Sequence, residues 1–227
     1  IDDPGSLAVS MKLSASINRL GGALNNVQSA ISFIEVQDGL LFTAGNIITR
    51  MSELKAFASQ DPMKGEQDIS SYNNEFKDLQ LQLFNISEMT FNGVSLFANY
   101  VTAKGSTEVL FNAQNQNLGR DNTISIFTSA QGASGSKISI NKSLLLSALT
   151  LRTDGSLAGT DDGTNAAWSV VESADKSSIT ANSDTWITLA NTSQATTMSL
   201  DQVSSGIFEK AIENISYLRA QNGGSQS

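Results

Sequence analysis

The chain has 227 residues, of which 40% are hydrophobic, and it carries a net charge of -8 with no histidine and no cysteine. The negative charge repels phosphate backbones and anionic headgroups, so we expect neither a nucleic-acid nor a membrane partner. Without histidine or cysteine there is no Ser-His-Asp or Cys-His nucleophile, no histidine-ligated metal and no disulfide, so only carboxylate, lysine, tyrosine or cofactor chemistry would remain for an enzyme. We expect neither an enzyme nor a cofactor.

The first predicted element is a helix over residues 6–60. Its apolar residues alternate between spacings of four and three, and Asp38 stands at the one position where this stripe lapses. Such spacing gives a single apolar seam for a partner helix, and about 55 helical residues would span roughly 80 Å. The seam residues are Leu13, Ile17, Leu20, Leu24, Val27, Ile31 and Ile34, then Leu41, Ala44, Ile48, Met51, Leu54 and Ala58.

A second helix is predicted at about 66–88, after a break at Asp61-Pro62. Its apolar positions have the same period as the first helix, so the two should pack antiparallel across a short turn. These positions are Ile69, Tyr72, Phe76, Leu79, Leu83 and Ile86.

Residues 91–128 should form turns and hairpin strands. Asn92-Gly93 is a turn signal, and the runs 109–114 and 123–128 are rich in strand-forming residues. Residues 129–192 are rich in Gly, Ser, Thr, Asn and Asp, and short apolar runs interrupt them. We interpret this stretch as a variable surface insert of small strands and turns, with Trp168 and Trp186 in its small core.

Helix returns from about residue 193 to the end of the chain. Leu200, Val203, Ile207, Ala211, Ile215 and Leu218 make one apolar stripe. None of the three helices can bury its seam alone, so a shared bundle is the economical arrangement. The predicted fold is mainly α with a small β part. It is a long antiparallel helical rod built from residues 1–128 and 193–227, with a β-hairpin region and the insert 129–192.

Five short blocks resemble those of bacterial flagellin, and they occur in the same order at both ends of the chain. They are Asp2–Ser10, Asn25–Ser32, Arg50–Leu54, Thr90–Val94 and Ala211–Ala220. The resemblance covers about 1–128 and 195–227 and leaves the middle unmatched. It implies a core fragment of a flagellin that lacks the terminal segments through which flagellins polymerise.

This resemblance also implies a function. The chain is expected to be a structural subunit of the extracellular flagellar filament, self-assembling with other subunits for motility. An export chaperone and the filament cap are further expected partners. A hook–filament junction protein shares part of the pattern, and a surface-displayed flagellin homologue is a second alternative. Either would act in adhesion or ligand binding, with Trp168 and Trp186 as candidate ligand contacts in the insert.

Flagellins are also sensed by a Toll-like innate receptor that binds their long helices. Arg50, Leu54 and Glu75 match positions of that receptor surface. The structural alternative is that Arg50 and Glu75 are solvated helix charges and Leu54 belongs to the core. Ser52 and Lys55 depart from the family at neighbouring positions.

Overall fold

The computed structural model describes most of the helical rod and parts of the region between its helices. It has one 57-residue helix, α1 (Pro4–Gln60), and two 22-residue helices, α2 (Glu66–Ser87) and α5 (Ser205–Gln226). The described residues are 4–60, 65–98, 123–129, 131, 134–152, 186–191 and 197–226. All statements below concern these residues.

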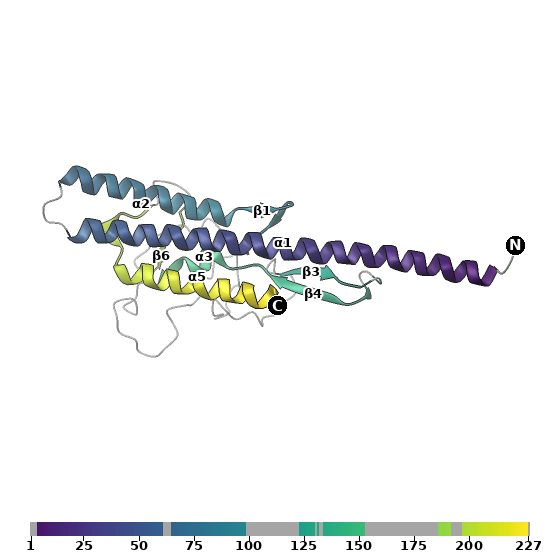
Figure 1. Ribbon diagram of the computed structural model, residues 1–227. Coiled ribbons are helices and arrows are strands. Elements are labelled where there is room, and N and C mark those ends of the chain that lie inside the picture. Colours follow the sequence, from purple (N-terminus) through teal and green to yellow (C-terminus); the bar gives the residue numbers. More distant parts are fainter. Residues whose placement is uncertain are drawn as a thin grey trace, which may run out of the picture.

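The three helices form an elongated body, and α1 is its axis (Figure 1). Helix α2 returns along one side of α1, and α5 lies along another side. The N-terminal part of α1 extends past the ends of both shorter helices (Figure 1). The prediction of a mainly α-helical rod made from both ends of the chain is therefore confirmed.

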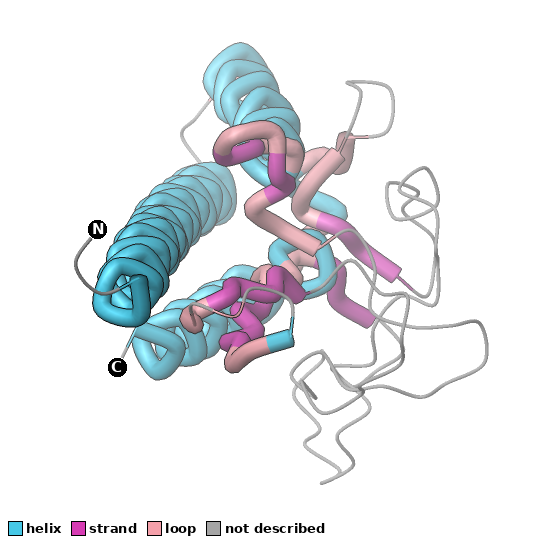
Figure 2. The backbone as a smooth tube through the Cα atoms, turned by 90° about the vertical axis from the view of Figure 1, so that its right-hand side faces the viewer, coloured by secondary structure: helices cyan, strands magenta, loops and turns pink. Residues whose placement is uncertain are grey.

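Three small antiparallel strand pairs accompany the helices, and Figure 2 shows them on one side of α1. Strand β1 (Thr90–Phe91) pairs with β2 (Val94–Ser95). The turn between them has positive φ at both central residues, 49° at Asn92 and 78° at Gly93. Two positive φ values in a two-residue hairpin loop are typical of a type I′ turn, so the predicted Asn-Gly turn is confirmed.

The other two strand pairs use residues from the stretch expected to be an insert. Strand β3 (Thr123–Phe127) pairs with β4 (Lys137–Asn141). Strand β5 (Thr150–Arg152), which follows the short helix α3 (Leu145–Ala148), pairs with β6 (Trp186–Thr188). The predicted strand at 109–114 lies outside the described residues.

One hydrophobic core joins the helices to these strands. Its fully buried members on the helices include Leu41 and Met51 of α1 and Phe76 of α2, whose ring meets that of Phe208 of α5 edge-on at 6.0 Å. Leu145, Leu149 and Leu189 belong to the same core and are equally buried. Both flanks of the expected insert therefore pack into the rod, while residues 153–185 lie outside the described part.

The C-terminal helix begins later than the sequence pattern indicated. A 3-10 turn, η4 (Leu200–Gln202), precedes α5 and carries a capping box between Ser199 and Gln202. Val203 then adopts extended φ and ψ angles before the helix begins at Ser205. The predicted start near residue 193 was wrong, because the apolar spacing of Leu200 and Val203 continues the helical stripe although their backbone does not.

A buried amide ties the segment before α5 to α2. The Gln80 side chain donates from Nε2 to the Met198 carbonyl at 2.8 Å and accepts at Oε1 from the Met198 amide at 3.0 Å. The same Oε1 accepts from Nδ2 of Asn191 at 2.7 Å. Since an unpaired buried amide is costly, this arrangement fixes where residues 191 and 198 cross α2.

Candidate functional site

The candidate receptor residues lie where α1 and α2 run together. Nε of Arg50 donates to Oε1 of Glu75 at 2.7 Å, and its Nη2 donates to Oε2 of the same carboxylate at 3.2 Å. Its Nη1 reaches Glu53 at 3.1 Å. Hydrogen bonds from the guanidinium to Glu75, and then to Glu53, raise the pKa of Arg50 above its ordinary value.

The third residue of that set has a different environment. Leu54 is completely buried and belongs to the core, whereas the side chains of Arg50 and Glu75 are 43% and 41% exposed. The structure thus brings Arg50 and Glu75 together as a surface ion pair. Because Leu54 is enclosed in the core, its side chain is not accessible to a partner.

The two tryptophans of the expected insert are not brought together by the described structure. Trp186 begins β6, where its backbone is in register with Arg152. Trp168 lies outside the described residues. Their role as ligand contacts stays a prediction.

An exposed apolar stripe lies on the first half of α1. Leu13, Ile17, Leu20 and Leu24 are 56%, 63%, 52% and 60% exposed. The predicted seam is therefore only partly covered within the described chain. It lies open over its N-terminal members, while Ile34 and the seam residues beyond it up to Leu54 are buried. A contiguous exposed apolar surface of this kind marks an interaction site.

An apolar cavity of about 330 Å³ opens beside the middle of α1. Phe33 of α1 and Phe91 of β1 meet edge-on there with ring centroids 6.1 Å apart. Ile124 and Ile126 of β3 and Ile140 of β4 complete the apolar lining. None of the described residues that line the cavity has an ionisable side chain.

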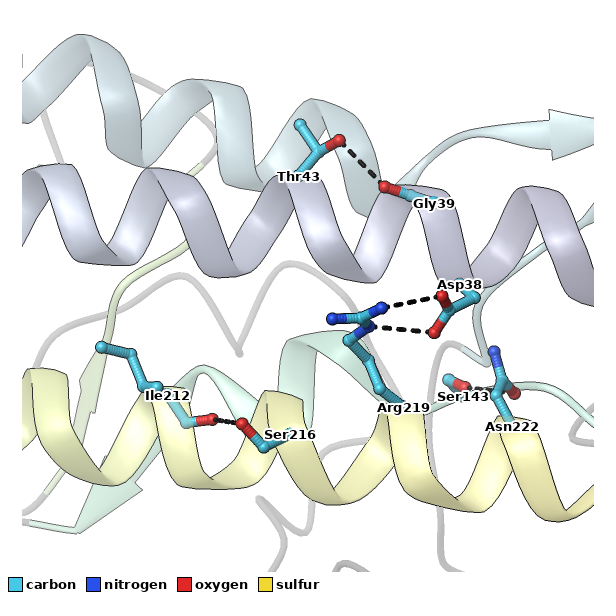
Figure 3. A network of polar contacts seen from close by, with 8 residues as sticks. All are labelled: Asp38, Gly39, Thr43, Ser143, Ile212, Ser216, Arg219 and Asn222. Carbon is cyan, nitrogen blue, oxygen red and sulfur yellow. Dashed lines mark hydrogen bonds and ion pairs between the residues drawn. The ribbon is translucent and has the colours of Figure 1, made fainter.

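One ion pair that the sequence interpretation did not anticipate joins Asp38 of α1 to Arg219 of α5 (Figure 3). Arg219 donates from Nε to Oδ1 and from Nη2 to Oδ2, both at 3.0 Å. Its guanidinium carbon also lies 5.1 Å from the centre of the Phe42 ring. The lapse of the apolar stripe at Asp38 was the available signal, and Arg219 lies in one of the five blocks.

None of the helices in the described ranges is both long and apolar enough to cross a bilayer. The same ranges hold no group of three or more Asp and Glu side chains placed to bind a metal. What the arrangement offers is a stiff helical shaft with an apolar stripe, an apolar cavity and a charged patch. These are features through which a protein contacts other macromolecules.

Part of the chain is similar to proteins of a known family. Residues 1–102 match the model of the bacterial flagellin N-terminal helical region. The chain is 37% identical over 101 residues to a protein named flagellin from Halalkalibacterium halodurans, covering 44% of this chain and 37% of the relative. It is 33% identical over 110 residues to a flagellar filament 31.3 kDa core protein of Treponema maltophilum, covering 48% of this chain and 38% of the relative. The alignments thus span less than two fifths of either relative.

Proposed function

We propose that the chain is a flagellin and a structural subunit of the flagellar filament, because its residues 1–102 match the bacterial flagellin N-terminal helical region. The matched region contains α1, α2 and the β1–β2 hairpin. These elements supply two of the three long helices of the rod. One observation supports the proposal: the residues that match the family model form α1 and α2, two helices of the rod.

The mechanism of such a subunit is mechanical. A stiff helix pair presents the same lateral surfaces at fixed positions on every copy, and a lattice repeats these surfaces by head-to-tail contacts that do not close into a ring. Contacts of this kind extend as a filament. We propose self-assembly with other subunits, an extracellular location in the filament, a role in motility, and no enzymatic activity.

Immunogold electron microscopy of the source bacterium tests this function. An antibody raised against residues 1–227 should label the filament along its whole length. Labelling confined to the junction of hook and filament would replace the proposal with the junction-protein alternative. Labelling of the cell surface alone would replace it with the surface-displayed homologue.

We propose in addition that the flagellin-sensing Toll-like receptor recognises the face of α1 and α2 around the Arg50–Glu75 ion pair. Both side chains are accessible, and the pair holds them in a fixed geometry on two packed helices. A receptor reporter assay with Arg50→Ala and Glu75→Ala should show a loss of signal. The matched control is Lys210→Ala, which removes an exposed charge paired within α5. Equal signals from all variants would remove this part of the proposal.

A further inference from the structure

The dipeptide Asn-Gly occurs twice in the chain, in two different backbone settings. Asn92-Gly93 forms the turn of the β1–β2 hairpin, and Asn222-Gly223 lies within helix α5. In this dipeptide the backbone nitrogen of the glycine can close a five-membered ring on the asparagine side chain. Glycine obstructs the ring least, because it has no Cβ. The local structure therefore decides which of the two pairs can react.

The hairpin turn leaves both reacting groups of Asn92-Gly93 accessible. Both residues are exposed, and a Cβ placed on Gly93 would meet nothing within 4 Å. The strand ladder pairs Phe91 with Val94, so the hydrogen bonding that closes a two-residue turn belongs to these flanking residues. The nitrogen of Gly93 and the amide carbon of Asn92 are therefore both accessible to solvent.

The hairpin is also short enough to open locally. Each strand has two residues, and the Leu96 amide donates to the Met89 carbonyl at 3.1 Å below the paired residues. A two-stranded hairpin is only marginally stable by itself, and local opening costs little free energy where few contacts are buried. The backbone of Asn92 can therefore rotate into a reactive conformation without unfolding of the rod.

Asn222 has the same neighbour but a protected setting. It is 4% exposed, and its Oδ1 accepts a hydrogen bond from Oγ of Ser143 at 3.4 Å. Figure 3 shows this contact between α5 and the segment that follows β4. Asn222 and Gly223 both belong to α5, in which each backbone amide donates to the carbonyl four residues earlier. The helix thus holds the Gly223 nitrogen and prevents its rotation toward the side chain of Asn222.

We propose that Asn92 is a site of spontaneous deamidation in the folded protein. The Gly93 nitrogen loses its proton and forms a bond to Cγ of Asn92, while the bond from Cγ to Nδ2 breaks and ammonia leaves. Water then adds to one of the two carbonyls of the resulting succinimide ring. Opening at Cγ gives aspartate, and opening at the backbone carbonyl carbon gives isoaspartate, in which the backbone runs through the side chain. Neither step oxidises or reduces an atom.

The two products affect the hairpin differently. Aspartate keeps the original backbone and, like asparagine, accepts a positive φ in a turn. Isoaspartate adds one methylene to the backbone, so the turn can no longer join Phe91 to Val94 in the same register. Because Phe91 packs edge-on against Phe33 of α1, the longer turn loosens this contact. The reaction requires only the turn and water, so it does not depend on the proposed filament role.

Peptide mapping by mass spectrometry tests the site, with the folded chain incubated in mildly alkaline buffer. Each product has the mass gain of replacing NH2 by OH and one more negative charge than the original net charge of -8. Deamidation at Asn92 should be at least about tenfold faster than at Asn222, because reaction at Asn222 requires opening of α5. In concentrated urea the two rates should become similar. No reaction at Asn92, or a ratio of rates no larger in native buffer than in urea, would overturn the proposal.

Thermal unfolding tests the effect of the longer backbone. The Asn92→Asp variant reproduces the aspartate product and is the matched control, since it carries the same charge with an unaltered backbone. It should unfold at the temperature of the parent protein, whereas the isoaspartate form, separated by ion exchange, should unfold at least about 2 °C lower. Equal unfolding temperatures of the two forms would contradict the predicted loss of the turn.

Discussion

Arg219 of α5 binds the carboxylate of Asp38 on α1 through two hydrogen bonds of 3.0 Å each. Asp38 occupies the seam position at which an apolar residue is otherwise expected. The pair joins residues 181 positions apart in the chain and fixes the register of α5 along α1. The hydrogen bond to Asp38 raises the pKa of Arg219, so on the alkaline side this contribution to stability is lost only as the pH rises past the unfolded-state pKa of arginine.

Removing this ion pair should destabilise the fold modestly. Asp38→Asn and Arg219→Gln should each lower the free energy of unfolding by about 1 kcal/mol, because the pair is bidentate but the side chains of Arg219 and Asp38 are 40% and 32% exposed. Urea unfolding of the single and double variants in a double-mutant cycle measures the coupling. The effect should shrink at high salt.

The control for that cycle is the Lys210–Glu213 pair within α5, whose side chains are 47% and 63% exposed. Glu213→Gln should change stability by less than about 0.5 kcal/mol. A coupling energy between Asp38 and Arg219 no larger than this control effect would contradict the assigned role.

The helices could be predicted from the sequence because their apolar spacing is regular over many turns. The period predicted α1 and α2 to within a few residues, and the Asn92-Gly93 pair predicted the type I′ turn because few residues accept two positive φ values. Leu54 is buried, as the seam spacing alone would place it.

The sequence pattern could not show which part of each apolar seam is covered by another element in the folded protein. Leu24 and Leu41 hold equivalent positions in the pattern, yet one is 60% exposed and the other fully buried. The difference depends on which elements lie against each position in the folded protein, and this tertiary relationship leaves no mark on local spacing. The hydrogen-bond partners of Asp38 and Gln80 could not be predicted for the same reason, since each partner lies more than 100 positions away in the chain.

This contrast along one helix gives a second prediction. Leu41→Ala should lower the free energy of unfolding by about 2 to 5 kcal/mol, because it leaves a cavity in the core. Leu24→Ala should cost less than about 0.5 kcal/mol at low protein concentration, where its side chain faces water. Thermal and urea unfolding of the two variants at a few micromolar measures both. Similar losses at the two positions would mean that Leu24 is covered within the monomer.

The buried amide of Gln80 gives a third prediction. Gln80→Leu leaves the backbone groups of Met198 and the side chain of Asn191 without their partners, so we expect a loss of about 2 to 3 kcal/mol. Gln82→Leu is the matched control, since Gln82 lies two residues along α2 and is exposed.

Amide hydrogen exchange locates the effect of the Gln80 substitution. Faster exchange in Gln80→Leu should concentrate at Met198 and Leu200, whose amides donate to Gln80 and to Asn73. Unchanged protection there, together with unchanged stability, would mean that this contact does not hold the segment in place.

Two glycine substitutions should change stability in opposite directions, because their backbones differ. Gly93 has a φ of 78°, where a Cβ costs about 1 to 2 kcal/mol, so Gly93→Ala should destabilise the protein. Gly39 lies in the exposed middle of α1 with nothing within 4 Å of an added Cβ. There alanine should stabilise by about 0.5 to 1 kcal/mol through its higher helix propensity. Thermal unfolding measures both shifts, and a gain in stability from Gly93→Ala would contradict the left-handed turn on which the β1–β2 hairpin depends.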